Sequence, residues 1–465
     1  MHSKYNPEAE ADRYIASLDI EAHTPYLILI EPGLGYMIPP LRKKAIHAKI
    51  IALHAAACPQ SSPADAVWYP GMEKTLQNFL EDEIPQGEAK DIRMIEWRPA
   101  LGLFERNYLY LIEETSTFIK RSDANARTIK SFGPRWFKNF FANLDIITLL
   151  VKPRLLDAPL IICGSGPSLE DAALRINKEH LDRGSFILAA SSAVMALDYR
   201  NISPHMVISS DGGGWAKLHL YEYLRGNHPC PLAAAMTAQL PSQCSGVPIL
   251  PLGDGSLWQT LILGSLGLPH MQLPQRGTVT ATALDLAFAL SNDSIYIAGM
   301  DLGSHDIKTH TRPYSFDRLL DETSNRFSPF YSQGFHRSTQ LKEGGSYAIY
   351  ASWFEKQLHS YPRPIYSLGR NNRVFEKTPR ESSLGMKGRG EAAKDLSFDI
   401  IKQKEEKLSE KALAVLSSAL SMPSHTEILR KELGELLFYG QSCPSADVLA
   451  QYCGDLIFSR RKAHG

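Results

Sequence analysis

Short apolar segments alternate with helix-length stretches through the middle of the chain, and this alternation restricts the possible folds more than any other feature. The apolar segments are residues 160–163, 185–190, 206–209, 232–235, 248–250 and 295–298. Strands joined by helical crossovers build a mainly parallel sheet with helices on both faces. We therefore expect a doubly wound α/β domain over residues 158–370, with its ligand beyond the carboxyl ends of the strands.

The N-terminal part repeats this pattern on a smaller scale. Buried-strand patterns occur at residues 26–30, 49–54 and 92–96, and they predict a small Rossmann-like α/β domain over residues 20–115. Apolar residues at helical spacing then predict a helical connector over residues 116–157.

The C-terminal third has a different character. Residues 301–345 lose all periodicity and predict an active-site loop or lid. Residues 385–465 carry helical patterns at 391–420, 426–438 and 446–458, and they predict a helical C-terminal module.

Composition excludes several classes of protein. Fifty Lys and Arg balance 50 Asp and Glu among 465 residues, so no global field attracts nucleic acid. The polar N-terminus predicts no secretory signal, and no apolar run reaches the ~20 residues that cross a bilayer. The six cysteines form no CxxC pair, so we expect neither a zinc ribbon nor a disulfide framework. We expect a cytoplasmic protein that binds neither nucleic acid nor a membrane.

The sharpest local motif is the turn that follows the strand at 160–163. It reads Gly164-Ser165-Gly166-Pro167-Ser168 and leads into a helix, so it can present backbone amides and hydroxyls to a phosphate. A capped strand-to-helix turn without a ligand is the other interpretation. The third glycine of a dinucleotide fingerprint is missing, which disfavours a nicotinamide enzyme.

Hydroxyl and carboxyl groups follow the next two strands. Ser191 and Ser192 end one strand, and Asp211 with three following glycines ends the other. The serines can contact a base or a sugar. The aspartate can hold a ribose hydroxyl or a metal-bound phosphate, or it can cap the next helix.

Two later motifs reach the same edge of the predicted sheet. Gly277, Thr278 and Thr280 open a helix, where they can bind an anionic group or serve as N-caps. Asp301 follows the strand at 295–298 and can orient a sugar or move a proton.

Two histidines near this edge are candidate bases. His310 and His336 both fall in the irregular segment that follows Asp301. No spacing of histidines, cysteines or carboxylates predicts a metal cluster.

The N-terminal domain has a glycine turn of its own. Glu31-Pro-Gly-Leu-Gly35 follows the first strand, but the second strand ends in Ala52-Leu-His-Ala55, without the carboxylate that clamps a ribose. A methyltransferase-like site is one interpretation, and we favour a structural turn.

The ordered motifs 164–169, 209–211, 277–282 and 299–301 resemble the domain shared by the motility accessory factor (Maf) family. The resemblance implies a flagellin glycosyltransferase. Such an enzyme would transfer a nonulosonic acid of the pseudaminic or legionaminic type from a CMP donor to Ser or Thr hydroxyls. CMP-nonulosonate and flagellin would be its partners, and no cofactor would be required.

The central domain is also similar to bacterial sialyltransferases. That similarity implies CMP contacts by residues 164–168 and places Ser191 and Ser192 near the cytidine, Thr278 and Thr280 near the donor phosphate, and Asp301 near a sugar.

Two alternatives remain open. The central domain is similar to the MptE-like pyrophosphokinase of 6-hydroxymethyl-dihydropterin, which implies ATP and Mg²⁺ with Asp211 and Asp301 as metal ligands. A flagellin-binding chaperone or export factor without catalysis is the other.

Overall fold

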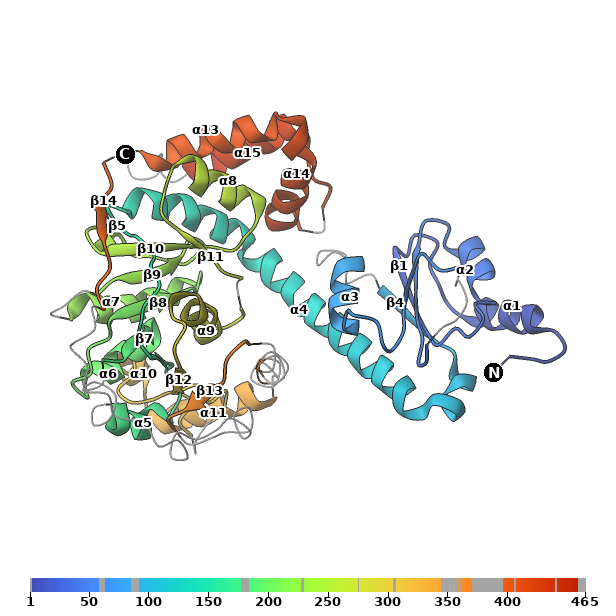
Figure 1. Ribbon diagram of the computed structural model, residues 1–465, viewed down its shortest axis with the longest axis horizontal. Helices are drawn as coiled ribbons and strands as arrows, with labels where there is room; N and C mark the ends of the chain where they lie inside the picture. Colours follow the sequence, from blue (N-terminus) through green and yellow to red (C-terminus); the bar gives the residue numbers. More distant parts are fainter. Residues whose placement is uncertain are drawn as a thin grey trace. The chain divides into compact units, whose positions relative to one another are not determined.

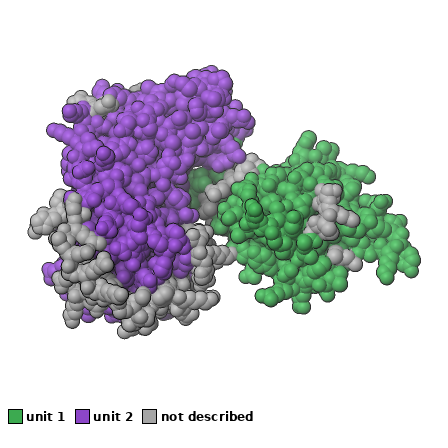
Figure 2. Space-filling view, viewed as in Figure 1, with its two compact units in different colours: residues 1–131, 438–441 green, residues 132–437, 442–465 purple. Residues whose placement is uncertain are grey.

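The computed structural model describes residues 2–57, 63–84, 92–176, 184–226, 230–274, 276–303, 307–343, 351, 354, 358, 361–369, 396–404, 407–439 and 441–458. The chain divides into two compact units, coloured separately in Figure 2. Unit 1 comprises residues 1–131 and 438–441, and unit 2 comprises residues 132–437 and 442–465.

Unit 1 is built on a four-stranded parallel sheet in the order β3-β2-β1-β4. Its strands are β1 (Tyr26–Ile30), β2 (Lys49–Leu53), β3 (Ala66–Trp68) and β4 (Ile92–Glu96), and its helices are α1 (Pro7–Ser17), α2 (Ile38–Lys44) and α3 (Leu76–Glu83). All five residues of β1 are buried, which explains their continuous apolar character. The core also includes Ala11 and Ile15 of α1, so this unit begins before residue 20.

Helix α4 (Leu101–Ile146) is 46 residues long and contributes to the cores of both units. Its first half buries Tyr108, Leu111 and Phe118 in unit 1. Its second half buries Phe137 and Phe140, whose rings lie 5.4 and 4.7 Å from that of Trp258 in unit 2. The connector expected over 116–157 is therefore part of a longer helix, followed by strand β5 (Leu149–Val151).

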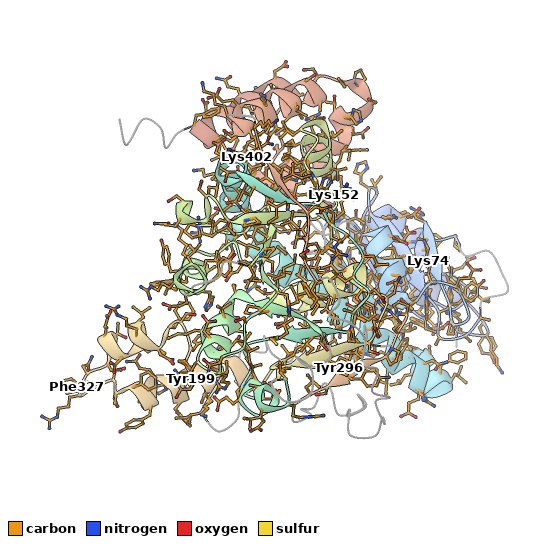
Figure 3. All side chains as sticks on the ribbon, turned by 60° about the vertical axis from the view of Figure 1, so that its left-hand side comes forward. Lys74, Lys152, Tyr199, Tyr296, Phe327 and Lys402 are labelled. Atoms are coloured by element: carbon orange, nitrogen blue, oxygen red, sulfur yellow. The ribbon has the colours of Figure 1, made fainter. Side chains whose placement is uncertain are left out.

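Unit 2 contains a ten-stranded sheet in the order β13-β12-β6-β7-β8-β9-β10-β5-β14, with β11 paired to β10 (Figure 1). All pairings are parallel except that of β14 with β5. The strands not yet bounded are β6 (Leu160–Cys163), β7 (Phe186–Ala190), β8 (Met206–Ser209), β9 (Leu232–Ala235), β10 (Pro248–Gly253), β11 (Met271–Gln272), β12 (Ile295–Ala298), β13 (Ile365–Ser367) and β14 (Ile400–Lys402). Figure 3 labels Lys402 of the edge strand β14 and, toward the opposite edge, Tyr296 of β12, the neighbour of the other edge strand β13. The predicted α/β fold with parallel sheets is confirmed.

Helix α9 (Val279–Leu290) covers one face of the unit 2 sheet. Alternate residues of the central strands, such as Leu160 and Ile162, share a core with Leu284 and Leu286 of this helix. This spacing is the two-residue period of a strand that buries one face against a helix. The other helices here are α5 (Leu169–Arg175), α6 (Val194–Asp198), α7 (Lys217–Arg225) and α8 (Leu257–Ser265).

The C-terminal helices belong to the same compact unit as the central sheet. They are α13 (Leu408–Leu420), α14 (Pro423–Leu437) and α15 (Ala446–Phe458). Asp145 of α4 accepts hydrogen bonds from the backbone N–H and the hydroxyl of Ser409, at 3.1 and 2.7 Å. Glu432 accepts hydrogen bonds from the N–H groups of Leu257 and Trp258 at the start of α8, at 2.9 and 3.2 Å. Each carboxylate thus satisfies backbone donors that a helix leaves unpaired.

The structure corrects two secondary-structure expectations. Residues 301–345 are not wholly irregular, because α10 (Asp317–Thr323) and α11 (Phe330–Glu343) lie within them. Residues 400–402, expected in a helix, form an antiparallel edge strand. The beginning of the expected C-terminal module, residues 385–395, lies outside the described residues. Within the described part of the chain, no helix combines the length and apolar character needed to cross a bilayer.

Candidate functional site

The predicted turn after β6 crosses the end of β12 at glycine residues. An ideal Cβ on Gly164 would lie 2.4 Å from the carbonyl oxygen of Gly299, and one on Gly299 would lie 2.2 Å from the carbonyl oxygen of Gly164. Gly299 also has a φ of +68°, which side chains disfavour. Only glycine permits so close a crossing, which brings the two carboxyl ends of β6 and β12 together.

Asp301 is held against the start of α5. Its Oδ2 accepts the backbone N–H of Ser168 at 3.0 Å, and an ideal Cβ on Gly166 would lie 2.0 Å from the same oxygen. The N–H groups of Gly164 and Gly166 donate to the carbonyls of Ala298 and Gly299, at 2.8 and 2.6 Å. These three amides therefore bind protein acceptors. β12 and Asp301 lie beside the turn and supply these acceptors, and nucleotide binding by the turn stays a prediction.

Side chains that carry hydroxyl groups lie around the turn. The hydroxyl of Ser192 donates to that of Ser165 at 2.9 Å and links the ends of β7 and β6. Thr280 lies beside Gly164. An ideal Cβ built on Gly164 would be 3.2 Å from Cγ2 of Thr280. The hydroxyl of Ser168 would be 3.0 Å from a Cβ placed on Gly369, which follows β13. We call Ser165, Ser168, Ser192, Thr280 and Asp301 the hydroxyl–carboxylate cluster.

The loop that precedes α10 is attached to this cluster. The N–H of Thr311 donates to the carbonyl of Ser165 at 2.8 Å. Glu170 of α5 accepts the N–H of Arg312 at 2.9 Å and pairs with the ammonium of Lys308 at 3.0 Å. Thr311 is fully buried, and its hydroxyl has no hydrogen-bond partner. A buried polar group without a partner is costly, so this hydroxyl lowers the stability of the loop.

His310 is next to this anchor in sequence, but its ring packs elsewhere. The ring stacks on Tyr314, with centroids 4.3 Å apart and an interplanar angle of 17°, and Nδ1 lies 3.0 Å from the hydroxyl of Thr309. His336 is exposed on α11. His305 and Asp306, which belong to the same expected loop, lie outside the described residues.

The other five predicted residues lie outside the cluster. Ser191 is buried at the end of β7. Asp211 is exposed and accepts the N–H of Gly213 at 2.7 Å. Thr278 caps α9, because its hydroxyl accepts the N–H of Ala281 at 3.2 Å, while the adjoining Gly277 is exposed. Pro167, a further member of the predicted turn, is buried and accepts the N–H of Glu170 at its carbonyl, at 3.2 Å.

Two asparagines of α4 shape the edge near Asp211, and sequence reasoning assigned them no role. Asn139 donates to the carbonyls of Gly212 and Thr237, at 3.3 and 2.9 Å. Asn143, one turn later, donates to the carbonyls of Met236 and Ala238, at 2.9 and 2.8 Å. Both side chains are at most 5% exposed, and each uses two N–H donors to fix a loop at the sheet edge. Their spacing of four, which places both on one face of a helix, is a signal that the sequence offers.

The electrostatic setting disfavours a thiolate at this edge. Cys163 ends β6 immediately before the turn, and burial raises its pKa to about 12. The thiol therefore stays protonated near neutral pH and cannot act as a nucleophile. Among the described residues, no three His, Cys, Asp or Glu side chains come together as a metal-ligand set.

Comparison with known proteins gives a family match for the central part of the chain. Residues 135–306 match the model of the family described as 6-hydroxymethylpterin diphosphokinase MptE-like. An uncharacterized protein of Treponema pallidum (strain Nichols) is 28% identical over 284 residues, which are 60% of this chain and 61% of that protein. The chain therefore matches less than two thirds of the length of this relative.

Two solved structures are similar. The Maf glycosyltransferase of Magnetospirillum magneticum AMB-1 superposes with a TM-score of 0.50 and 16% identity, over 94% of this chain and 75% of that one. The sialyltransferase CST-II, solved with a trisaccharide acceptor and CMP, gives a TM-score of 0.25 and 13% identity, over 53% of this chain and 92% of that one. The expected resemblance to the Maf family is thus confirmed for the fold, and the MptE-like domain is confirmed by the family model.

Proposed function

We propose that this chain is a cytoplasmic glycosyltransferase that transfers a nonulosonic acid from a CMP donor to Ser or Thr hydroxyls of flagellin. The observation that carries the proposal is the hydroxyl–carboxylate cluster at the carboxyl edge of the central sheet. Ligands of open α/β sheets bind at this edge. The Maf-like fold supports the choice of glycosyl transfer, and the donor and acceptor are those that the resemblance of the motifs to the Maf family implies.

The cluster has the chemistry to hold a nucleotide sugar. With three amides of the turn engaged, the hydroxyls of Ser165, Ser192 and Thr280 would bind the CMP phosphate and the cytidine. A carboxylate accepts up to about four hydrogen bonds, so Asp301 can bind the amide of Ser168 and also a sugar hydroxyl. The hydrogen bond from the N–H of Ser168 would hold this carboxylate in a fixed orientation.

The reaction would need little more than positioning and a base. The glycosidic carbon would form a bond to the acceptor oxygen as its bond to the CMP phosphate breaks, and CMP would leave with the electron pair. His310 would take the proton of the acceptor hydroxyl, as neutral imidazole can near pH 7. Because its ring now stacks on Tyr314, this role requires the loop to turn the ring toward the cluster.

The match to the diphosphokinase family favours a second candidate, transfer of diphosphate from ATP to a hydroxymethylpterin. For this reaction, Asp211 and Asp301 would be ligands of the same magnesium ion. The strand order β12-β6-β7-β8 separates the strands that carry them by three spacings, about 14 Å in all. Asp301 also faces α5, and Asp211 binds its own loop. This separation argues against a magnesium ion shared by the two carboxylates.

Calorimetric titration of the full chain separates the two functions. We expect CMP to bind without added Mg²⁺, and Ser192→Ala to weaken this binding about tenfold, or about 1.4 kcal/mol. The exposed Ser242 provides a matched control, since Ser242→Ala should bind CMP as the parent does. Binding of ATP with Mg²⁺, without binding of CMP, would establish the second candidate instead.

A transfer assay then tests the acceptor. Purified flagellin is incubated with CMP-pseudaminic or CMP-legionaminic acid, and intact-mass spectrometry detects the added sugar. We expect Asp301→Ala to abolish transfer, and transfer at the parental rate by this variant would refute the assignment of Asp301.

A further inference from the structure

Unit 1 contains a cavity of about 420 Å³ at the carboxyl edge of its four-stranded sheet. Its walls combine apolar and aromatic groups with a pair of buried polar side chains. The residues used below are Glu31, Leu34, Tyr36, His54, Ala56 and Phe104. This volume lies within the range of about 300–1,000 Å³ that small-molecule sites occupy.

Glu31 and His54 form the polar floor of this cavity. Glu31 follows β1 and His54 follows β2, and these side chains are 5% and 4% exposed. Glu31 Oε1 lies 3.4 Å from His54 Nδ1, and Oε2 accepts the N–H of Ala55. Glu31 also has a φ of +49°, a conformation that is unusual and costly without glycine. Strain of this kind is typical of residues that a fold holds in place for a ligand.

His54 has an unused ring nitrogen. Nδ1 faces the carboxylate of Glu31, whereas Nε2 is buried and has no hydrogen-bond partner. In the tautomer that carries its hydrogen on Nδ1, that hydrogen is directed to the carboxylate of Glu31 and Nε2 is an acceptor. A buried acceptor without a partner costs free energy, which a ligand with an N–H or O–H donor would recover.

The charge and the walls of the cavity select the kind of ligand. The buried carboxylate of Glu31 disfavours a phosphate, because like charges repel strongly where water is excluded. Tyr36, Phe104 and Leu34 offer apolar and aromatic surfaces to a planar ring. The cavity also lies at the carboxyl ends of β1 and β2, and this is the edge of a parallel α/β sheet at which ligands bind.

We propose that unit 1 holds a second ligand site, which binds an uncharged purine nucleoside. The ring packs between the aromatic walls, and its N–H or ribose O–H groups donate to His54 Nε2 and to Glu31. This site is independent of the glycosyl transfer proposed for unit 2. Residues of the glycine turn at 31–35 would contact this ligand, whereas the sequence favoured a purely structural role for that turn.

Calorimetry and ligand-observed NMR with adenosine and guanosine test the proposal on the full chain. We expect saturable binding of at least one nucleoside, at least tenfold weaker in His54→Ala and unchanged in His23→Ala, a control at an exposed histidine of the same unit. We also expect the 5′-monophosphate to bind at least tenfold more weakly than the nucleoside, and Glu31→Gln to reduce this preference.

Controls distinguish this site from the one in unit 2 and from loss of folding. Binding should persist in Ser192→Ala and should be lost in Ala56→Leu, which fills the cavity while retaining both polar residues. Circular dichroism of each variant verifies its fold. Binding of neither nucleoside, equal binding of the monophosphate, or parental binding by folded His54→Ala or Ala56→Leu would overturn the proposal.

Discussion

Substitution of Gly166 by alanine tests the contact between the turn and the end of β12. The new Cβ would lie 2.0 Å from Asp301 Oδ2 and 2.7 Å from the carbonyl oxygen of Gly299. The first conflict is relieved only if the carboxylate rotates away from the amide of Ser168, and the second only if a strand shifts. The substitution therefore both overpacks the site and breaks a charge-assisted hydrogen bond.

The magnitude follows from these two costs. Overpacking costs about 1–3 kcal/mol, and a hydrogen bond to a charged group contributes about 1.5–3 kcal/mol. We expect Gly166→Ala to lower the free energy of unfolding of unit 2 by about 2.5–6 kcal/mol, the sum of these ranges. Gly214→Ala is the matched control, because a Cβ there has no heavy atom within 4 Å. Its effect should stay within about 0.5 kcal/mol.

Urea unfolding followed by circular dichroism measures the difference. Because a chain with two compact units need not unfold in one step, hydrogen exchange of the peptide 160–169 reports the site itself. Asp301→Ala completes a double-mutant cycle, and we expect the double variant to be about 1–3 kcal/mol more stable than additivity gives, since one clash is removed. Additive effects, or a Gly166→Ala variant as stable as the parent, would refute the described contact.

Three further predictions concern packing and pH. Asn143→Ala leaves two buried carbonyls without hydrogen-bond donors and should lower the free energy of unfolding, measured in urea, by about 2–4 kcal/mol. Ala at the exposed Asn78 should leave it unchanged. Glu432→Ala removes the carboxylate that caps α8 and should cost about 0.5–2 kcal/mol in the same assay, whereas Ala at the exposed Glu427 should not. Burial lowers the pKa of His205 below its ordinary 6.5, and Nδ1 accepts a backbone N–H at 3.0 Å. The contribution of neutral His205 to stability is therefore complete above the pKa of the unfolded state and is lost as the pH falls through the pKa of the folded state. We expect His205→Gln to show a smaller decline of the urea midpoint between about pH 7 and about pH 5 than the parent shows. An unchanged pH slope, or equal effects of a variant and its control, would contradict the corresponding prediction.

The long strands could be predicted because each carries its own signal. All five residues of β1 and of β7 are buried on both faces, so each is a continuous apolar run. β14 escaped prediction because its three residues are all exposed. Edge pairing with β5, rather than burial, makes it a strand. The helices α10 and α11 were also missed, since their polar sequences lack the apolar stripe that predicts a buried helix face.

The candidate site was predictable in its residues and not in its contacts. Gly164, Ser192 and Asp301 stand out because each directly follows a strand, and parallel strands place such residues on one edge of a sheet. That the carboxylate of Asp301 takes the amide of Ser168 depends on β12 lying beside β6, although some 130 residues separate them in sequence.

The sequence by itself therefore determined the α/β class, the long strands and the glycine turns, because these follow from the periodicity and conformational limits of neighbouring residues. Only the tertiary structure decided which strands are neighbours. This order of strands determines that the amides of the turn already donate hydrogen bonds to protein acceptors. It also determines that Asn139 and Asn143 hold two loops and that Glu31 and His54 share a cavity. These contacts join residues distant in sequence. They are selected by the packing of the whole core, which no local pattern encodes.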